Sequence, residues 1–252
     1  MKAAITQDDI IYFIVTDRFF GVNKTSSGTS DTQIHGGTLD GILAKLDYLK
    51  TLGITAIWIT PVYKNINTFF SSEPYHYYWT EDFDSIDPRL LNGTKLSTST
   101  DKGTLHAFVD QCEAAGFKVV LDMVVNHCGY GAEHHFASDW FNHGTEGDVK
   151  KPLAGLPDFN HDNPEVLDYF ISNVKSWIQE GKVTNIRMDT VKHVESKFWH
   201  YFRAQIKGEF PDTFLLGEVL CEGKDDVSKL LEYQNYHDFD SIFDFPLCTA
   251  LR

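Results

Sequence analysis

The chain has 252 residues, a formal net charge of −14 at pH 7 and a hydrophobic fraction of 42%. This apolar content excludes a wholly disordered chain, and only four cysteines in this length exclude a disulfide-stabilised scaffold. The acidic charge argues against a nucleic-acid partner, which needs clustered lysine and arginine. No apolar run approaches the roughly 18 residues of a membrane span, so we expect no membrane partner either.

The N-terminal residues 1–9 lack the apolar core of a signal peptide. The sequence therefore predicts either a cytoplasmic protein or one whose signal was removed. The four cysteines are widely spaced without a CxxC pair, so we expect free thiols rather than a metal site.

Strand-like apolar runs alternate with helical patterns along the chain. Predicted strands cover 9–17, 54–60, 117–125, 183–189, 213–218 and 240–245. Helical spacing of apolar residues predicts helices over 37–52, 103–115, 164–180, 195–207 and 225–236. This alternation is typical of α/β folds with right-handed βαβ units and a parallel sheet. A barrel is favoured over an open doubly wound sheet because the GxGxxG motif is missing after the first strand.

A complete (β/α)8 or TIM barrel takes about 250 residues without large insertions. Here two long connections, 61–102 and 127–163, follow the carboxyl ends of strands, and only six strands are counted. We therefore expect a partial TIM barrel with about six of eight strands. Residues 1–126 and 164–252 are expected to form this barrel, incomplete at its C-terminus, and 127–163 a small excursion domain.

Ionisable side chains stand where the predicted strands end. Asp189 ends the fourth strand and Glu218 the fifth, so they should face one mouth of the barrel from adjacent strands. Two carboxyls facing one cleft are what glycoside hydrolysis requires. Arg187 lies two residues before Asp189, so it shares the same strand face and should keep that carboxylate ionised. Glu218, between Leu216 and Val219, is expected to have a raised pKa.

A set of motifs appears in the order seen in the alpha-amylase family, which the sequence therefore resembles from about Ile10 onward. The motifs are Thr16-Asp-Arg-Phe19, Tyr75-His-Tyr-Tyr-Trp79, Leu121-Asp-Met-Val-Val-Asn-His127, Leu156-Pro-Asp-Phe-Asn160, Ile186-Arg-Met-Asp-Thr-Val-Lys-His193 and Leu216-Gly-Glu218. The Arg-x-Asp-x-x-x-His block is the most specific of them. Within the family the sequence is most similar to bacterial alpha-amylases, cyclomaltodextrinases and cyclodextrin glucanotransferases.

The resemblance implies a role for each matching residue. Asp189 would be the nucleophile and Glu218 the general acid/base of a retaining glycosidase acting on alpha-1,4-glucans. Arg187 would orient Asp189, and Asp122 would support the site from below. His127 would bind the sugar, Tyr78 would stack on it, and His76 would help to position it. Lys192 and His193 would line the acceptor side.

The same resemblance implies one calcium site. Asn126, Asp158 and the carbonyl of His193 would hold an ion that clamps the excursion to the barrel. Calcium prefers oxygen ligands of this kind. The same residues could instead serve as structural hydrogen-bonding groups.

The family has a further Asn-His-Asp element near the seventh strand, and this chain ends at Arg252 before one. We therefore expect a fragment that lacks the third catalytic acid, with weak or no activity alone. Open barrel edges predict possible self-association. Two alternatives stay open: an alpha-glucan transglycosylase, and a non-catalytic glucan-binding fragment.

Overall fold

The fold is described from a computed structural model that covers residues 3–22, 30–91, 100–221 and 227–252. Its main sheet has six parallel strands in the order β1-β2-β5-β6-β7-β8. The strands are β1 (Ile11–Ile14), β2 (Ala56–Ile59), β5 (Lys118–Met123), β6 (Asn185–Met188), β7 (Phe214–Gly217) and β8 (Ser241–Ile242). Because the spatial order follows the chain order, the sheet winds in one direction, as in a barrel and unlike a doubly wound sheet.

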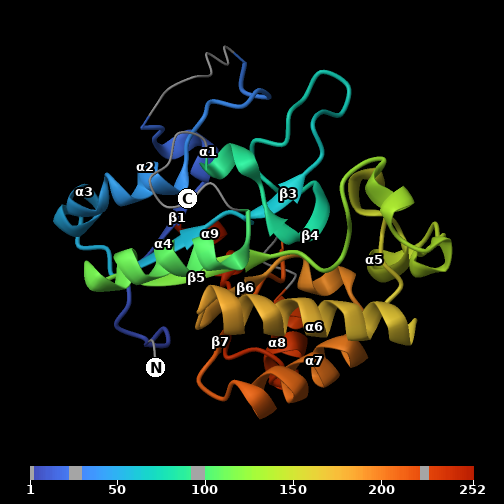
Figure 1. Cartoon of the computed structure of the whole chain (residues 1–252). Coiled ribbons are helices and arrows are strands. Elements are labelled where there is room, and N and C mark those ends of the chain that lie inside the picture. Colours follow the sequence, from blue (N-terminus) through green and yellow to red (C-terminus); the bar gives the residue numbers. More distant parts are fainter. Residues whose placement is uncertain (1–2, 23–29, 92–99, 222–226) are drawn as a thin grey trace.

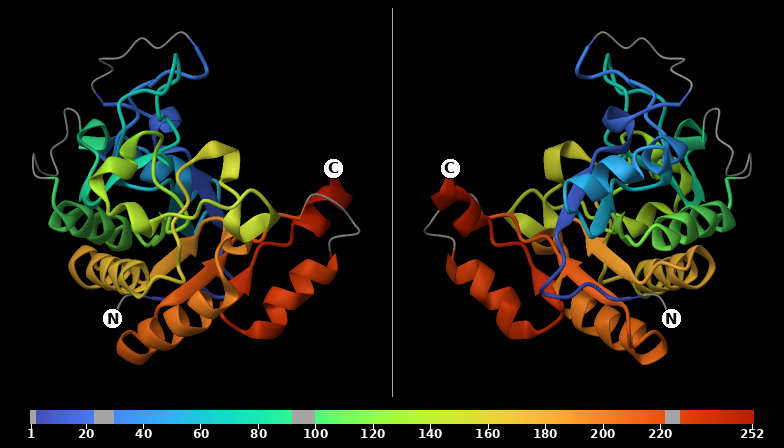
Figure 2. Two further views of the ribbon diagram at one scale, coloured as in Figure 1. Left: turned by 90° about the vertical axis from the view of Figure 1, so that its right-hand side faces the viewer. Right: turned by 90° about the vertical axis from the view of Figure 1, so that its left-hand side faces the viewer.

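Helices connect these strands and cover the outside of the sheet, with α4, α6 and α7 side by side in Figure 1 and Figure 2. They are α1 (Thr16–Phe19), α2 (Leu39–Leu43), α3 (Leu46–Thr51), α4 (Lys102–Ala114), α5 (Gly147–Lys150), α6 (Pro164–Gly181), α7 (Ser196–Glu209), α8 (Val227–Tyr236) and α9 (Phe245–Leu251). No helix among the described residues has the length and apolarity to cross a membrane.

The longest helix, α6, shows why the sequence forms these elements. The Asn163 side chain accepts a hydrogen bond from the Glu165 amide at the N-cap, and Pro164 occupies the first turn. Apolar residues at helical spacing, from Val166 to Trp177, turn one buried face toward the sheet. The helix ends where Lys182 adopts a left-handed conformation with φ of 55°.

The sheet is strongly curved, and three aromatic rings inside it demonstrate the curvature. Trp58 of β2 stacks on Phe13 of β1 at 3.9 Å, and its ring lies 5.1 Å from that of Phe243, which follows β8. In a flat sheet β2 and β8, four positions apart, would be about 19 Å from each other. The six strands therefore form a curled half-barrel, which confirms the predicted partial TIM barrel.

Strands β1 and β8 lie at the two ends of the sheet order within the described residues. Self-association through these edges stays a prediction. The division into a barrel and an excursion domain likewise stays a prediction, although the 127–163 segment pairs with itself through the bridges His127–Asp158 and Phe141–Phe159.

Several predicted boundaries were wrong. The helix expected over 37–52 is two helices, α2 and α3, because Lys45 leaves helical geometry and places its ammonium 4.1 Å above the Phe20 ring. The strand expected over 240–245 has two residues, and Asp244 then caps α9 by accepting a hydrogen bond from the Leu247 amide. The predicted start of α8 at Asp225 lies outside the described residues, which resume at Val227.

The long connection 61–102 contains an antiparallel hairpin that the sequence did not predict. Its strands are β3 (Tyr63–Asn65) and β4 (Thr80–Ile86), and their pairing shifts register twice. The hairpin packs on the core through Phe83, whose ring contacts those of Tyr63 and Phe170. It thereby holds the segment 75–79 over the carboxyl end of the sheet.

Candidate active site

A single buried arginine gathers the predicted acids. The guanidinium of Arg187, 4% exposed, contacts Asp122 and Asp189 through Nη1 at 2.7 Å each and Glu218 through Nη2 at 2.8 Å. The parallel register of β5 and β6 places Asp122 beside Arg187, and the two-residue period of β6 puts Asp189 on the same face. The carboxyl groups of Asp189 and Glu218 therefore converge on adjacent nitrogens of one guanidinium.

These residues line a cavity of about 680 Å³ at the carboxyl ends of the strands. Of the predicted site residues it brings together Asp189, Glu218, Arg187, His127, Tyr78, His76, Lys192 and His193. Asp122 lies beneath this cavity, fully buried, and reaches it through Arg187 and Tyr78. The predicted calcium residues Asn126 and Asp158 do not line the cavity.

Asp122 binds three donors at the base of the site. Its Oδ1 accepts from Arg187, and its Oδ2 accepts from the Tyr78 hydroxyl at 2.6 Å and from Trp58 Nε1 at 3.0 Å. Burial raises the pKa of Asp122 to about 7, Arg187 opposes that shift, and Asp189 adds to it. Asp122 thus fixes the orientation of Arg187 and Tyr78.

Glu218 is set apart from Asp189 by its surroundings. Its Oε2 accepts a hydrogen bond from the Thr190 amide at 3.0 Å in addition to the Arg187 contact. Burial raises the pKa of Glu218, and although Arg187 opposes this shift, the neighbouring Asp189 charge reinforces it. The pKa of Glu218 is therefore raised, as its apolar flanks led us to expect.

Two of the three histidines that line the cavity are neutral near pH 7. Burial lowers the pKa of both His76 and His127 to about 4. His127 Nε2 lies 3.2 Å from the Tyr78 carbonyl, and the Tyr78 amide donates to His76 Nδ1 at 3.0 Å. Each neutral ring has one donor and one acceptor nitrogen, which suits contacts with hydroxyl groups.

The rim of the cavity comes from the excursion segment 127–163. Leu153, Ala154 and Leu156 line it, and Ala154 has a positive φ of 53°. The Tyr130 hydroxyl donates to the Ala154 carbonyl at 2.8 Å and so fixes this strained turn. On the other side, the Asp148 carbonyl lies 2.8 Å from His193 Nδ1.

The sequence reasoning missed seven lining residues: Phe13, Trp58, Thr190, Leu220 and the rim residues Leu153, Ala154 and Leu156. Phe13 and Trp58 point into the half-barrel from β1 and β2, and Leu220 follows β7. The place of Trp58 in the site could have been predicted, because it is the large residue at an inward position of a predicted strand. The rim residues carried no signal, because their place depends on the path of the excursion.

The oxygen groups expected to hold calcium lie beside this cavity. Asn126 Oδ1 is buried without a hydrogen-bond partner, and burial raises the pKa of Asp158 to about 7. One Asp158 oxygen accepts from Asn142 Nδ2 at 2.9 Å. Among the described residues no three His, Cys, Asp or Glu side chains gather as a metal-binding group, so an ion here would depend on amide and carbonyl oxygens as well.

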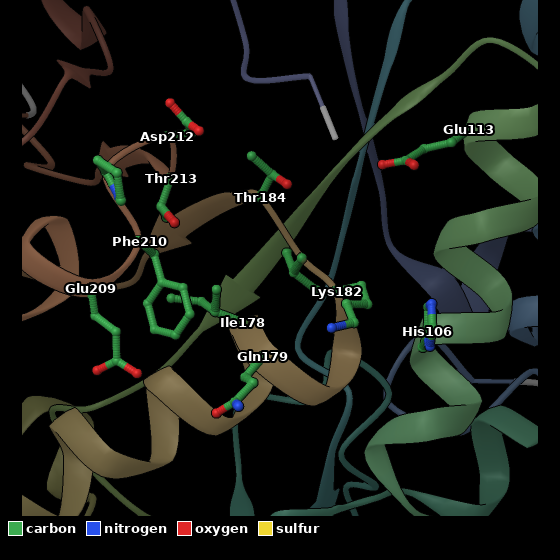
Figure 3. Close-up of a pocket in the computed structure, with 12 residues that line it drawn as sticks. His106, Glu113, Ile178, Gln179, Lys182, Thr184, Glu209, Phe210, Asp212 and Thr213 are labelled. Atoms are coloured by element: carbon green, nitrogen blue, oxygen red, sulfur yellow. The ribbon is translucent and has the colours of Figure 1, made fainter. Parts of the chain in front are cut away.

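A second large pocket, of about 670 Å³, opens near the amino ends of β6 and β7 (Figure 3). Phe210 extends into it, with Lys182 and Gln179 nearby. It contains none of the predicted site residues.

A sheet wound in one direction, with two carboxyl groups facing one cavity at the carboxyl ends of its strands, defines a β/α-barrel fold with a paired-carboxylate site. Residues 13–152, more than half of the chain, match the family described as "Alpha amylase, catalytic domain". The chain belongs to the alpha-amylase family, which confirms the resemblance inferred from its motifs.

Relatives and solved structures agree with this assignment. Alpha-amylase 2 of Dictyoglomus thermophilum is 32% identical over 98% of this chain and 42% of its own length. The crystal structure of the alpha-amylase from Geobacillus thermoleovorans, complexed with acarbose, is 37% identical with a TM-score of 0.82, over 97% of this chain and 53% of that one. CldA, a cyclomaltodextrin glucanotransferase, is 25% identical with a TM-score of 0.81, over all of this chain and 58% of its own. The chain thus spans about half the length of the proteins it resembles.

Proposed function

We propose that the chain provides the catalytic acids of a retaining glycoside hydrolase that acts on alpha-1,4-glucans such as starch, maltooligosaccharides and cyclodextrins. The observation that carries this proposal is the convergence of Asp189 and Glu218 on one guanidinium at the base of a sugar-sized cavity. Retaining enzymes hold their two carboxyls about 5–5.5 Å apart, whereas inverting enzymes need room for a water between them. Two acids held by adjacent nitrogens of Arg187 fit the shorter separation.

In the first step the Asp189 carboxylate attacks the anomeric carbon while the bond to the leaving oxygen breaks. Glu218 gives its proton to that oxygen, and the burial that raises the pKa of this carboxyl favours the protonated form that a general acid needs. In the second step Glu218, now a carboxylate, takes a proton from water, and the resulting hydroxide displaces Asp189 from the sugar. Arg187 holds the Asp189 carboxylate in position for this attack through the 2.7 Å contact.

The other cavity residues bind the sugar. Tyr78 would offer its ring to one sugar face, while neutral His76 and His127 would exchange hydrogen bonds with hydroxyl groups. Lys192 and His193, which come from the turn after β6, would contact the acceptor side. The fixed hydrogen bond from Tyr78 to Asp122 supports this arrangement because it sets the ring orientation before substrate arrives.

We also propose one calcium ion held by Asn126 Oδ1, the Asp158 carboxylate and the His193 carbonyl. Two features support this: no described residue donates a hydrogen bond to the buried Asn126 oxygen, and burial raises the pKa of Asp158. A cation would coordinate the amide oxygen and stabilise the charged carboxylate. Bound calcium would supply positive charge that joins the excursion segment to the barrel. Its ligands would belong to both parts, which fits an excursion domain at 127–163 on a barrel formed by 1–126 and 164–252.

Reducing-sugar release from maltoheptaose tests the catalytic assignment. We expect Asp189→Asn and Glu218→Gln to lower the rate at least a thousandfold, whereas Asp212→Asn, in the other pocket, should leave it unchanged. Unchanged hydrolysis in Asp189→Asn would overturn the assigned nucleophile.

A transglycosylase is the second candidate, favoured by the similarity to CldA. It differs only in whether water or a sugar hydroxyl takes the glycosyl unit from Asp189. Products longer than maltoheptaose would identify it. Binding of maltoheptaose without any bond cleavage would instead indicate a non-catalytic glucan-binding chain.

A further inference from the structure

A third pocket, away from the candidate active site, combines aromatic and charged side chains. It has a volume of about 510 Å³ and lies between the hairpin β3–β4, the excursion segment 127–163 and the start of α6, which are neighbours in Figure 1. Its volume is within the range of about 300–1,000 Å³ that is typical of small-molecule sites. None of the residues assigned above to catalysis or calcium lines it.

One wall of this pocket is a group of three partly exposed aromatic rings. The Trp140 ring lies 5.3 Å from that of Tyr169 and 6.0 Å from that of Phe136. The indole of Trp140 donates to Glu165 at 3.2 Å, and Tyr169 packs against the buried rings of the core. The rings are therefore held in place before any ligand binds, which lowers the entropy cost of binding.

Another part of the pocket lining carries two carboxylates, one of which forms an ion pair with a lysine. Glu81 contacts Lys64 at 3.1 Å and His135 at 3.3 Å, and Asp82 lies next to it. Each carboxylate oxygen has a second acceptor site beyond these contacts.

Fixed aromatic faces beside hydrogen-bond acceptors match one kind of ligand best. A sugar ring presents apolar C–H faces for stacking and hydroxyl donors for carboxylates, and it carries no charge. A cationic peptide would need an excess of negative charge, which the ion pair between Glu81 and Lys64 reduces. We propose that this pocket, lined by Trp140, Tyr169 and Glu81, is a second glucan-binding site that holds the polymer while the cavity at Asp189 cuts it. The proposal rests on the proposed glucan substrate.

Calorimetric titration with maltoheptaose and electrophoresis through gels containing amylopectin test this site. We expect two maltoheptaose molecules per chain. Trp140→Ala should leave one, and it should raise the dissociation constant for amylopectin about tenfold or more. Phe210→Ala is the matched control, because that ring lies in a pocket of similar volume without a second aromatic wall (Figure 3). If Trp140→Ala does not fold, Glu81→Gln combined with Asp82→Asn should show the same loss.

Failure of this proposal is distinct from failure of the proposed function. Suppose that the wild-type chain binds one maltoheptaose, that Tyr78→Ala abolishes this binding and that the pocket variants leave it unchanged. This result would overturn the second site alone. No glucan binding at all by the wild-type chain would overturn both. An oligoarginine peptide that binds in a Trp140-dependent way, without maltoheptaose binding at the pocket, would assign it to a cationic partner instead.

Discussion

Replacement of Arg187 by Met removes the centre of the candidate site. The guanidinium is 4% exposed and makes three ion pairs of 2.7, 2.7 and 2.8 Å, so its loss leaves three acids buried without a counter-ion. Breaking a buried pair by removal of one partner costs about 3–5 kcal/mol. We expect the free energy of unfolding at pH 7.5 to fall by about that amount, measured by urea denaturation with tryptophan fluorescence.

The loss should depend on pH. Loss of Arg187 raises the folded-state pKa values of Asp122 and Glu218 further above their unfolded values of about 4, because the Arg187 charge opposes both shifts in the wild-type chain. An acid with a raised folded pKa contributes stability below its unfolded pKa and loses it as pH rises through the folded pKa. The variant should therefore be less destabilised at pH 5 than at pH 7.5.

Arg203→Met is the control for this experiment, because Arg203 makes a surface ion pair with Asp240 at 3.0 Å and is 30% exposed. Such a pair contributes about 0–1 kcal/mol. Equal losses in both variants, or a loss in the Arg187 variant that does not change with pH, would refute the view of Arg187 as a buried counter-ion.

Three further predictions concern the excursion and the sheet. EDTA should lower the melting temperature of the wild-type chain but not of Asn126→Ala; equal shifts would contradict the calcium site. Tyr130→Phe should cost about 1 kcal/mol and speed thermolysin cleavage near Ala154, because the turn loses the hydrogen bond that fixes it; an unchanged cleavage rate would show that the turn is held otherwise. Gly217→Ala should cost about 1–3 kcal/mol in urea denaturation, since its Cβ would lie 2.9 Å from the Phe239 ring; no loss would mean that Phe239 can move aside.

The strands and most helices were predictable because their periodicity is local. Apolar runs that are buried on both faces, such as β5 at Lys118–Met123, have no other stable place than a covered parallel sheet. The hairpin was not predictable, because β4 carries Glu81, Asp82 and Asp84 and its fit depends on bulged pairing with β3. The helix α9 had a usable signal in Asp244 followed by Pro246.

The part of the site that depends on the two-residue alternation of side chains along one strand was predictable. The shared face of Arg187 and Asp189 is a property of one strand, and their 2.7 Å contact was within reach of sequence reasoning. The contact of Arg187 with Asp122 required the lateral register of β5 and β6, which no local pattern encodes. The hydrogen bond from Trp58 to Asp122 likewise required the lateral register of β2 and β5.

The curvature of the six-stranded sheet has a consequence for how the chain folds. The ring of Trp58 can meet that of Phe243 only after nearly the whole chain has been synthesised. Contacts so distant in sequence slow folding, and a ribosome adds about 5–20 residues per second. The apolar inner face of the first strands therefore stays exposed for many seconds during synthesis, and a nascent chain of this kind is a natural client for a holding chaperone.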